Sequence, residues 1–257
     1  MKKEICTALA GLLMSAPLVA DENYSNLNVG PTFFTFRGKE ETMNGYKEDK
    51  GLYCGARAEF EYAKPDSIYA GLLGVYAPGA GTTTHTIQDT DVSAYTSMKV
   101  GTYLWQVEAR GGKHFKVMEK SSIVPYLAGG MYHVDSSITL TSSSALGDSE
   151  KKSQTKMNWY YVAAGLSGSY AVHEMVDLAL NAKLMRHLYA KNEVSINDSS
   201  STEDMGAKWG YEIALPVKVK AGKGSMWNFQ VEPFFLKIDT SKDVNVYGGR
   251  LSVQKAY

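Results

Sequence analysis

The sequence predicts an all-β protein, folded as a single antiparallel, up-and-down transmembrane β-barrel of about ten strands. Three observations support this fold class. Apolar and polar residues alternate with a period of two, the alternating segments are long enough to cross a bilayer, and the connections alternate in length. A tilted transmembrane strand needs ~9–11 residues, whereas a transmembrane helix would need a run of ~18 apolar residues, which the sequence lacks.

The alternating segments follow one another along the chain. In the segment 175–190, Leu184 lies on an apolar face and Lys183 on a polar one, as expected of a half-buried strand, and the segment 208–220 alternates as clearly. In chain order, the ten predicted strands lie at about 24–37, 50–63, 66–77, 94–110, 121–138, 157–172, 175–190, 208–220, 226–239 and 244–257.

The N-terminus has the pattern of a secretory signal peptide. Residues 1–3 are basic, residues 5–13 are apolar but too few to span a bilayer, and small residues follow. Cleavage is expected after Ala20, with Ala16 as the alternative site. The predicted organisation is a signal peptide at 1–20 and a barrel at 21–257.

The composition excludes several classes of function. Twenty-seven lysines and arginines balance 27 aspartates and glutamates, so we expect no nucleic-acid partner. Cys6 leaves with the signal peptide and Cys54 remains alone, so no disulfide can form within the mature chain. No histidines and cysteines have metal-ligand spacing, and we expect neither a metal nor a cofactor.

The connections between the predicted strands are alternately long and short. Transmembrane barrels have short turns on one side of the membrane and longer loops on the other, so the odd-numbered connections are expected outside. Serine, threonine, aspartate and lysine are frequent in the long ones, which suits solvent exposure and recognition. The four long connections are 38–49, 78–93, 139–156 and 191–207, and the last outer link, 240–243, is a short exception.

Aromatic residues mostly lie near the ends of the predicted strands. Amphipathic rings are favoured at the level of lipid headgroups, so this placement predicts interfacial girdles. The residues concerned are Tyr53, Tyr62, Trp105, Tyr126, Tyr132, Trp159, Tyr160, Tyr170, Tyr189, Trp209, Tyr211, Trp227 and Tyr257.

The C-terminal strand and one internal segment resemble a known superfamily. Tyr247, Leu251, Val253 and Tyr257 share one face of the final strand, and residues 125–132 read Pro-Tyr-Leu-Ala-Gly-Gly-Met-Tyr. Both are similar to the OmpA-like and opacity-type barrels of Gram-negative outer membranes. The resemblance implies an outer-membrane location, contact with lipid, and recognition of the C-terminal strand by the barrel-assembly machinery. Small barrels of that superfamily have eight strands, which is the alternative count.

Charged residues of both signs lie on the predicted inward faces. A barrel of ~8–10 strands has a narrow interior filled by side chains, so we expect these charges to pair with one another. The alternative interpretation is a narrow channel for small ions or solutes. The predicted lumen residues are Arg57, Glu59, Glu61, Glu108, Arg110, Asp177, Lys183, Glu212, Lys218, Lys220, Glu232 and Arg250.

Three residues suggest a hydrolase as a further alternative. His133, Asp135 and His187 are predicted to point inward near the external rim, and a carboxylate that orients an imidazole is the minimal general-base unit. Omptin-type proteases, which are ten-stranded barrels, place such residues at that rim, and lipid-modifying barrels use a related set. The sequence has none of the omptin signatures, and we expect no enzymatic activity.

The main functional expectation is a structural or surface-interaction role, similar to that of an adhesin. In this interpretation the barrel is a scaffold and the external loops bind a host or extracellular ligand. A soluble periplasmic barrel is the remaining alternative, because alternation alone does not reveal which solvent the apolar face contacts.

Overall fold

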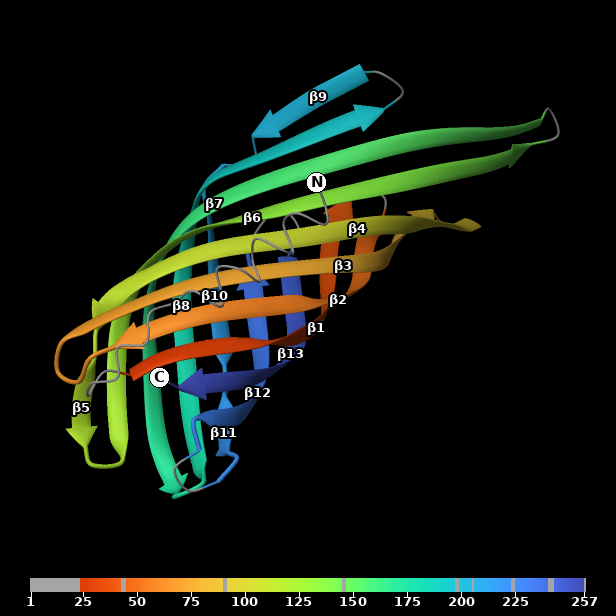
Figure 1. Ribbon diagram of the computed structural model, residues 1–257. Coiled ribbons are helices and arrows are strands. Elements are labelled where there is room, and N and C mark those ends of the chain that lie inside the picture. Colours follow the sequence, from red (N-terminus) through yellow and green to blue (C-terminus); the bar gives the residue numbers. More distant parts are fainter. Residues whose placement is uncertain are drawn as a thin grey trace, which may run out of the picture.

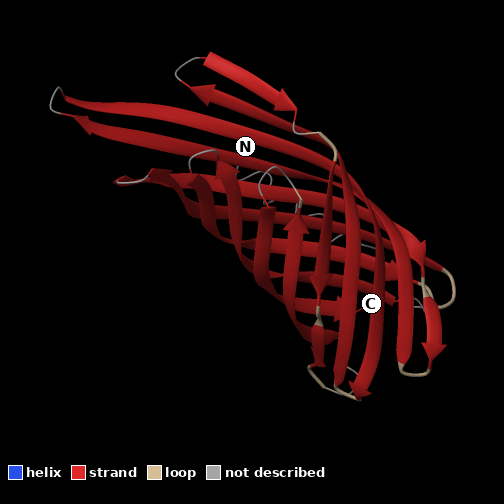
Figure 2. Cartoon of the chain, turned by 180° about the vertical axis from the view of Figure 1, so that it is seen from behind, coloured by secondary structure: helices blue, strands red, loops and turns tan. Residues whose placement is uncertain are grey.

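The computed structural model describes residues 24–42, 45–89, 92–144, 147–196, 199–204, 206–222, 225–239 and 243–256. These residues form thirteen strands in one sheet and no helix (Figures 1 and 2). The described residues therefore contain no helix long and apolar enough to cross a membrane. The strands are β1 (Tyr24–Thr42), β2 (Gly45–Ala63), β3 (Ile68–Asp89), β4 (Val92–Lys113), β5 (Phe115–Met118), β6 (Ser121–Ser144), β7 (Gly147–His173), β8 (Val176–Ile196), β9 (Ser199–Asp204), β10 (Lys208–Ala214), β11 (Val217–Lys220), β12 (Trp227–Ile238) and β13 (Asp243–Ala256).

The sheet closes on itself because β1 pairs with both β2 and β13. β10 and β11 pair with the same two neighbours, β8 and β12, and so form the two halves of one wall strand, interrupted at Leu215 and Pro216. β5 pairs with β6 in the register of β4, and β9 pairs with β8 in the register of β10, so these two short strands extend the lines of β4 and β10 and add no strand to the wall. The wall is thus a closed, antiparallel, ten-stranded barrel, which confirms the predicted count against the alternative of eight.

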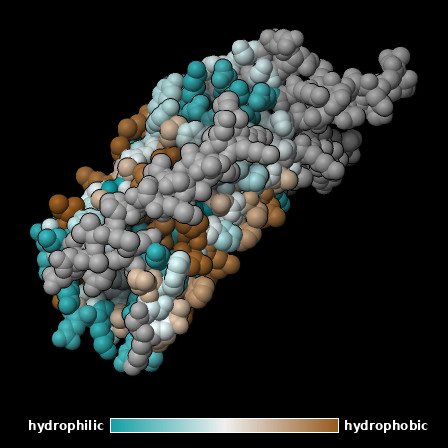
Figure 3. Space-filling model, in the orientation of Figure 1, coloured by the Kyte–Doolittle hydropathy of each residue, from teal (hydrophilic) through white to brown (hydrophobic). Residues whose placement is uncertain are grey.

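The apolar face of each strand lies outside the barrel. Leu180, Leu184 and Leu188 of β8 are half exposed, whereas Lys183 and Met185 between them are buried. Ile213 and Leu215 alternate in the same way with buried Glu212 and Ala214 on β10. Figure 3 shows hydrophobic residues along the middle of the wall, between hydrophilic residues near both ends. An outer band of this kind is suited to acyl chains, and no second sheet covers it among the described residues.

The segments predicted as long loops are largely paired strand. Pairing continues to Thr42 with Gly45, to Asp89 with Val92 and to Ser144 with Gly147, so three of these connections are long paired hairpins. The fourth folds back through β9 onto β8. We call the end of the barrel that carries these four hairpins the hairpin end. The opposite end, with the links 64–67, 174–175 and 221–226, is the turn end (Figure 1).

Four of the aromatic residues assigned to interfacial girdles lie inside the barrel instead. Tyr53, Tyr126 and Tyr132 are almost fully buried, and Trp159 is directly opposite Tyr132 on the inner face. Tyr160, Tyr170, Tyr189, Trp209, Tyr211 and Trp227 are exposed on the outer face, as an interfacial position requires. Tyr62 and Trp105 are partly exposed, and Tyr257 lies outside the described residues.

The outer band predicts a depth-dependent response to charge. We expect Leu184→Arg, in the middle of β8, to lower the free energy of unfolding by about 2–4 kcal/mol, because an arginine would face acyl chains. Leu188→Arg is the matched control, since Leu188 neighbours Tyr189 near the headgroups and should cost about 1 kcal/mol or less. Urea unfolding in phospholipid vesicles measures both variants. Equal costs would contradict the assignment of depth.

Candidate functional site: the barrel lumen

The polar face of each strand points into the lumen, where side chains from opposite walls meet. The inward positions carry neutral amides toward the turn end, charges at the middle and aromatic rings toward the hairpin end. Strand alternation fixes which residues point inward, and closure of the sheet brings residues far apart in the chain together.

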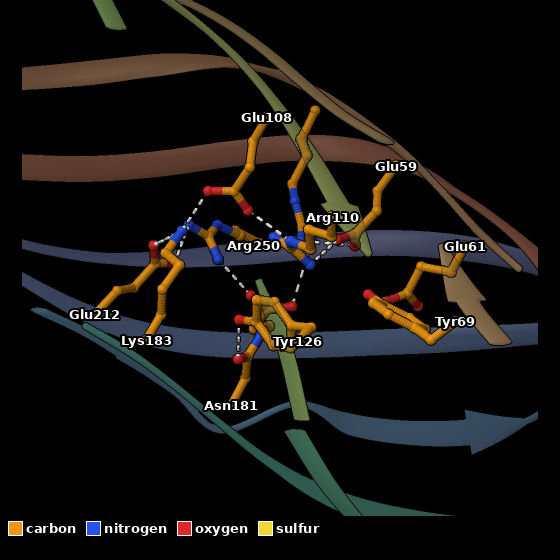
Figure 4. Close-up of polar contacts among 12 residues, drawn as sticks. Glu59, Glu61, Tyr69, Glu108, Arg110, Tyr126, Asn181, Lys183, Glu212 and Arg250 are labelled. Carbon is orange, nitrogen blue, oxygen red and sulfur yellow. Dashed lines mark hydrogen bonds and ion pairs between the residues drawn. The ribbon is translucent and has the colours of Figure 1, made fainter. Parts of the chain in front are cut away.

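Eight charged residues at the middle form a closed cycle of ion pairs, which we call the charge ring; Figure 4 labels all of them except Arg57 and Glu232. Acidic and basic side chains alternate around it, four of each, and each ion contacts one ion on either side. In order, the pairs are Arg57–Glu59 at 2.7 Å, Glu59–Arg110 at 2.7 Å, Arg110–Glu108 at 2.5 Å, Glu108–Lys183 at 2.7 Å, Lys183–Glu212 at 2.9 Å, Glu212–Arg250 at 2.9 Å, Arg250–Glu232, and Glu232–Arg57 at 3.3 Å.

Burial makes the pairing of the charge ring obligatory. Glu108 has no exposed surface, and the other seven side chains are about nine-tenths buried or more. Transferring an ion out of water costs several kcal/mol, and that cost is offset only when each charge is paired and hydrogen-bonded. With four charges of each sign, the ring is neutral as a whole. The paired side chains of the charge ring therefore meet across the middle of the lumen.

Aromatic side chains cover the charge ring toward the hairpin end. The Tyr161 hydroxyl donates a 2.5 Å hydrogen bond to Glu108, and the Tyr161 ring stacks on Tyr132 with centroids 5.0 Å apart. On the opposite wall, Phe34 stacks on Tyr53 at 4.8 Å. Glycines make room for these rings, since a Cβ on Gly130 would lie 2.6 Å from the Tyr161 hydroxyl.

The four remaining predicted lumen charges lie between the charge ring and the turn end. Glu61 accepts a 2.9 Å hydrogen bond from the Tyr69 hydroxyl. Lys220 and Asp177 face one another at 3.9 Å, with both side chains partly exposed, and Lys218 is also partly exposed. Glu61 is thus held against buried Tyr69, the other three groups are partly exposed near the turn end, and none of the four is a member of the ring.

The structure separates the three residues of the predicted hydrolase site. His133 lies directly opposite Trp105 and stacks on it at 5.4 Å, so it is on the outer face of the wall. Asp135 is on the same outer face, where it accepts a 2.8 Å hydrogen bond from the Tyr103 hydroxyl. His187 points inward, as predicted, and is buried against Trp159. The inward orientation predicted for His133 and Asp135 is wrong, and these residues form no common site with His187.

The alternation of residues along β6 shows which of its faces contacts lipid. Leu127 has the same parity as His133 along β6, and a leucine marks the lipid face of a barrel. Leu127 is 70% exposed, whereas Tyr126 and Tyr132, of the other parity, are buried. Since Leu127 marks the lipid face, the alternation of β6 also predicts that Tyr126 and Tyr132 point into the lumen.

The residues predicted as an assembly signal lie on β13. Tyr247, Leu251 and Val253 are exposed in a row on the outer face of this strand. The fourth residue, Tyr257, lies outside the described part of the chain. Within the described residues, no group of three or more histidine, cysteine, aspartate or glutamate side chains could hold a metal ion.

Comparison with known proteins identifies similar folds but no family. No protein-family profile and no curated protein matches the sequence. Among solved structures, the outer-membrane protease OmpT from Escherichia coli is similar with a TM-score of 0.61 and 8% identity, over 95% of this chain and 99% of OmpT. The transport unit of the autotransporter AIDA-I from Escherichia coli has a TM-score of 0.47 and 12% identity, over 98% of this chain and 97% of that one.

The closed barrel, its apolar outer band and the likeness to OmpT define the class of this protein: it is an outer-membrane β-barrel. In barrels of this class the short turns face the periplasm and the long connections face outward. The turn end is accordingly periplasmic and the hairpin end external. The fold identifies the class and its membrane, and the activity must be argued from the side chains.

Proposed function

We propose that this protein is a surface-interaction barrel, in which the closed wall anchors external hairpins that bind a host or extracellular ligand. The observation that carries the proposal is the charge ring. A lumen filled by eight paired ions is suited to a rigid anchor rather than to transport, because opening it would separate buried opposite charges. In this proposal the barrel-assembly machinery recognises β13 through its exposed row Tyr247, Leu251 and Val253.

The external hairpins support this role through their height and composition. β4 and β6 pair no further than Val100 with Ile138, yet β6 and β7 stay paired to Ser144 with Gly147. Beyond that point β4 continues with β3 to Val92, so the β6–β7 hairpin separates from the β3–β4 hairpin and projects on its own (Figures 1 and 2). Its segment 139–156 is rich in serine, threonine and lysine, which suits a hydrated surface exposed to the outside.

Trimming the β6–β7 hairpin tests the proposal. Ile138 and Ser153 are register partners, so a tight turn can replace residues 139–152 without disturbing the wall below. We expect vesicles that carry the full chain to bind immobilised fibronectin, laminin or collagen, and the trimmed chain to lose most of that binding while it keeps the heat-modifiable gel mobility of a folded barrel. Equal binding by both chains, or no binding by the full chain, would count against the proposal.

Planar-bilayer recording tests the channel alternative. The proposal predicts no steady conductance through the full chain, because a path through the charge ring would separate buried, paired charges. A steady conductance that Arg57→Ala or Glu59→Ala alters would favour a narrow channel instead.

A further inference from the structure

An apolar groove lies on the outer wall at the turn end. It is a shallow, open depression of about 360 Å³ between β5, the start of β6, the end of β7 and the start of β8. Val117, Ile123, Tyr170, Leu178 and Leu180 contribute its apolar surface, and Gly168 lies among them. These strands lie side by side at the lower left of Figure 1.

Gly168 accounts for the depression. It lies directly opposite Ile123 on one side and Leu180 on the other, on the lipid-facing side of β7. A Cβ at Gly168 would approach only the Ser122 carbonyl oxygen, at 4.0 Å, so the position is open to solvent or lipid. The neighbouring Tyr170 and Leu180 are about half exposed and rise on either side of the gap.

β5 forms one side of the groove. Its apolar residues Phe115, Val117 and Met118 are all exposed, and the four-residue strand continues the line of β4 beside β6. Such exposure would be unfavourable in water and is favourable against lipid. The strand therefore extends the apolar surface of the wall down to the periplasmic edge of the membrane.

Positive charge surrounds the same strand. The segment 113–120 carries Lys113, Lys116 and Lys120 against one carboxylate, Glu119, and all four are exposed. The Lys113 ammonium lies 4.9 Å from the centroid of the Phe115 ring, next to the apolar surface. Basic groups beside an apolar groove at a membrane interface are suited to anionic headgroups.

We propose that this groove is a binding site for one anionic phospholipid of the periplasmic leaflet. An acyl chain lies along Gly168 between Ile123 and Leu180, and the phosphate contacts Lys120, which precedes the groove residue Ser121. The occupant is a membrane lipid because the groove opens on the face of the wall that contacts the bilayer.

Filling the groove tests the site for the acyl chain. Gly168→Leu adds an apolar side chain at the gap, and Gly129→Leu is the matched control, since Gly129 is also outward, with nothing within 4 Å of its Cβ, but lies outside the groove. Each protein is extracted from vesicles of phosphatidylglycerol and phosphatidylcholine in equal parts, and bound lipid is counted by native mass spectrometry. We expect Gly168→Leu to lose retained phosphatidylglycerol and Gly129→Leu to keep it. Equal retention by the two variants would overturn the proposal.

A second variant tests the headgroup contacts without changing the wall. Lys120→Gln should lower the preference for phosphatidylglycerol over phosphatidylcholine by about fivefold. Lys116→Gln is the matched control, because Lys116 pairs with Ser122 on the opposite face of the strand, and it should leave the preference unchanged. Both side chains are exposed, so these proteins should fold even if Gly168→Leu does not, and heat-modifiable mobility checks each. An unchanged preference in Lys120→Gln would overturn the proposal whatever the glycine variants show.

Discussion

Replacing Lys183 by methionine should lower the free energy of unfolding of the barrel by about 3–5 kcal/mol. Lys183 bridges Glu108 at 2.7 Å and Glu212 at 2.9 Å, and its side chain is 3% exposed. Methionine fills a similar volume but leaves the charge ring with four carboxylates and three cations. An uncompensated buried carboxylate is the source of the cost. Urea titration of the protein in phospholipid vesicles measures the change.

The control separates this effect from the loss of any inward lysine. Lys218 also points inward, but it is partly exposed near the turn end and is not in the charge ring. Lys218→Met should cost about 1 kcal/mol or less. Adding Glu108→Gln to Lys183→Met restores neutrality and should recover part of the loss. Equal destabilisation by the two single variants would show that the ring does not act as one unit.

A valine at Gly165 should lower the free energy of unfolding by about 3 kcal/mol or more. A Cβ at this position would lie 2.2 Å from the ring of Tyr126, well inside contact distance. The ring would have to move, and with it the 2.7 Å hydrogen bond from the Tyr126 hydroxyl to Asn181 and the stacking of Arg110, whose guanidinium lies 5.5 Å from the ring centroid. The midpoint temperature of heat-modifiable gel mobility reports the loss of the folded form.

The matched change lies on the other side of the wall. Gly249 of β13 is also a strand glycine, but a Cβ there meets nothing within 4 Å. Gly249→Val should leave the midpoint temperature nearly unchanged, since valine suits a strand that contacts lipid. If both valine variants unfold at the same temperature, strand propensity rather than packing against Tyr126 determines the outcome.

The wall was predictable because the bilayer imposes a strict pattern on it. Leu184 must contact lipid and Lys183 must not, and that requirement repeats at every second residue of a spanning strand. The same reasoning failed beyond the membrane. At 139–144 the sequence reads Thr-Leu-Thr-Ser-Ser-Ser, and a strand with water on both faces has no need to alternate. Paired hairpins therefore resembled loops.

The charge ring was predictable in its membership but not in its connections. Parity identified Lys183 and Glu108 as inward residues, yet they are 75 residues apart and meet across the lumen. Which ions pair depends on the tilt and stagger of the strands, and these follow from closure of the whole sheet rather than from any one segment. The inward position of each ring residue could be predicted from the sequence, but its ion-pair partners could not.

The strands of the wall extend to unequal heights above the membrane, so the external part of the protein differs from one side of the barrel to the other. β6, β7 and β8 continue well past the level at which β12 ends at Ile238, whereas β1 ends at Thr42, shortly beyond the start of its partner β13 at Asp243. A macromolecule that approaches along the cell surface meets the extended strands β6, β7 and β8 on one side of the barrel and the short strands β12 and β13 on the other. Two partners could therefore bind opposite sides of the same barrel at different distances from the membrane surface.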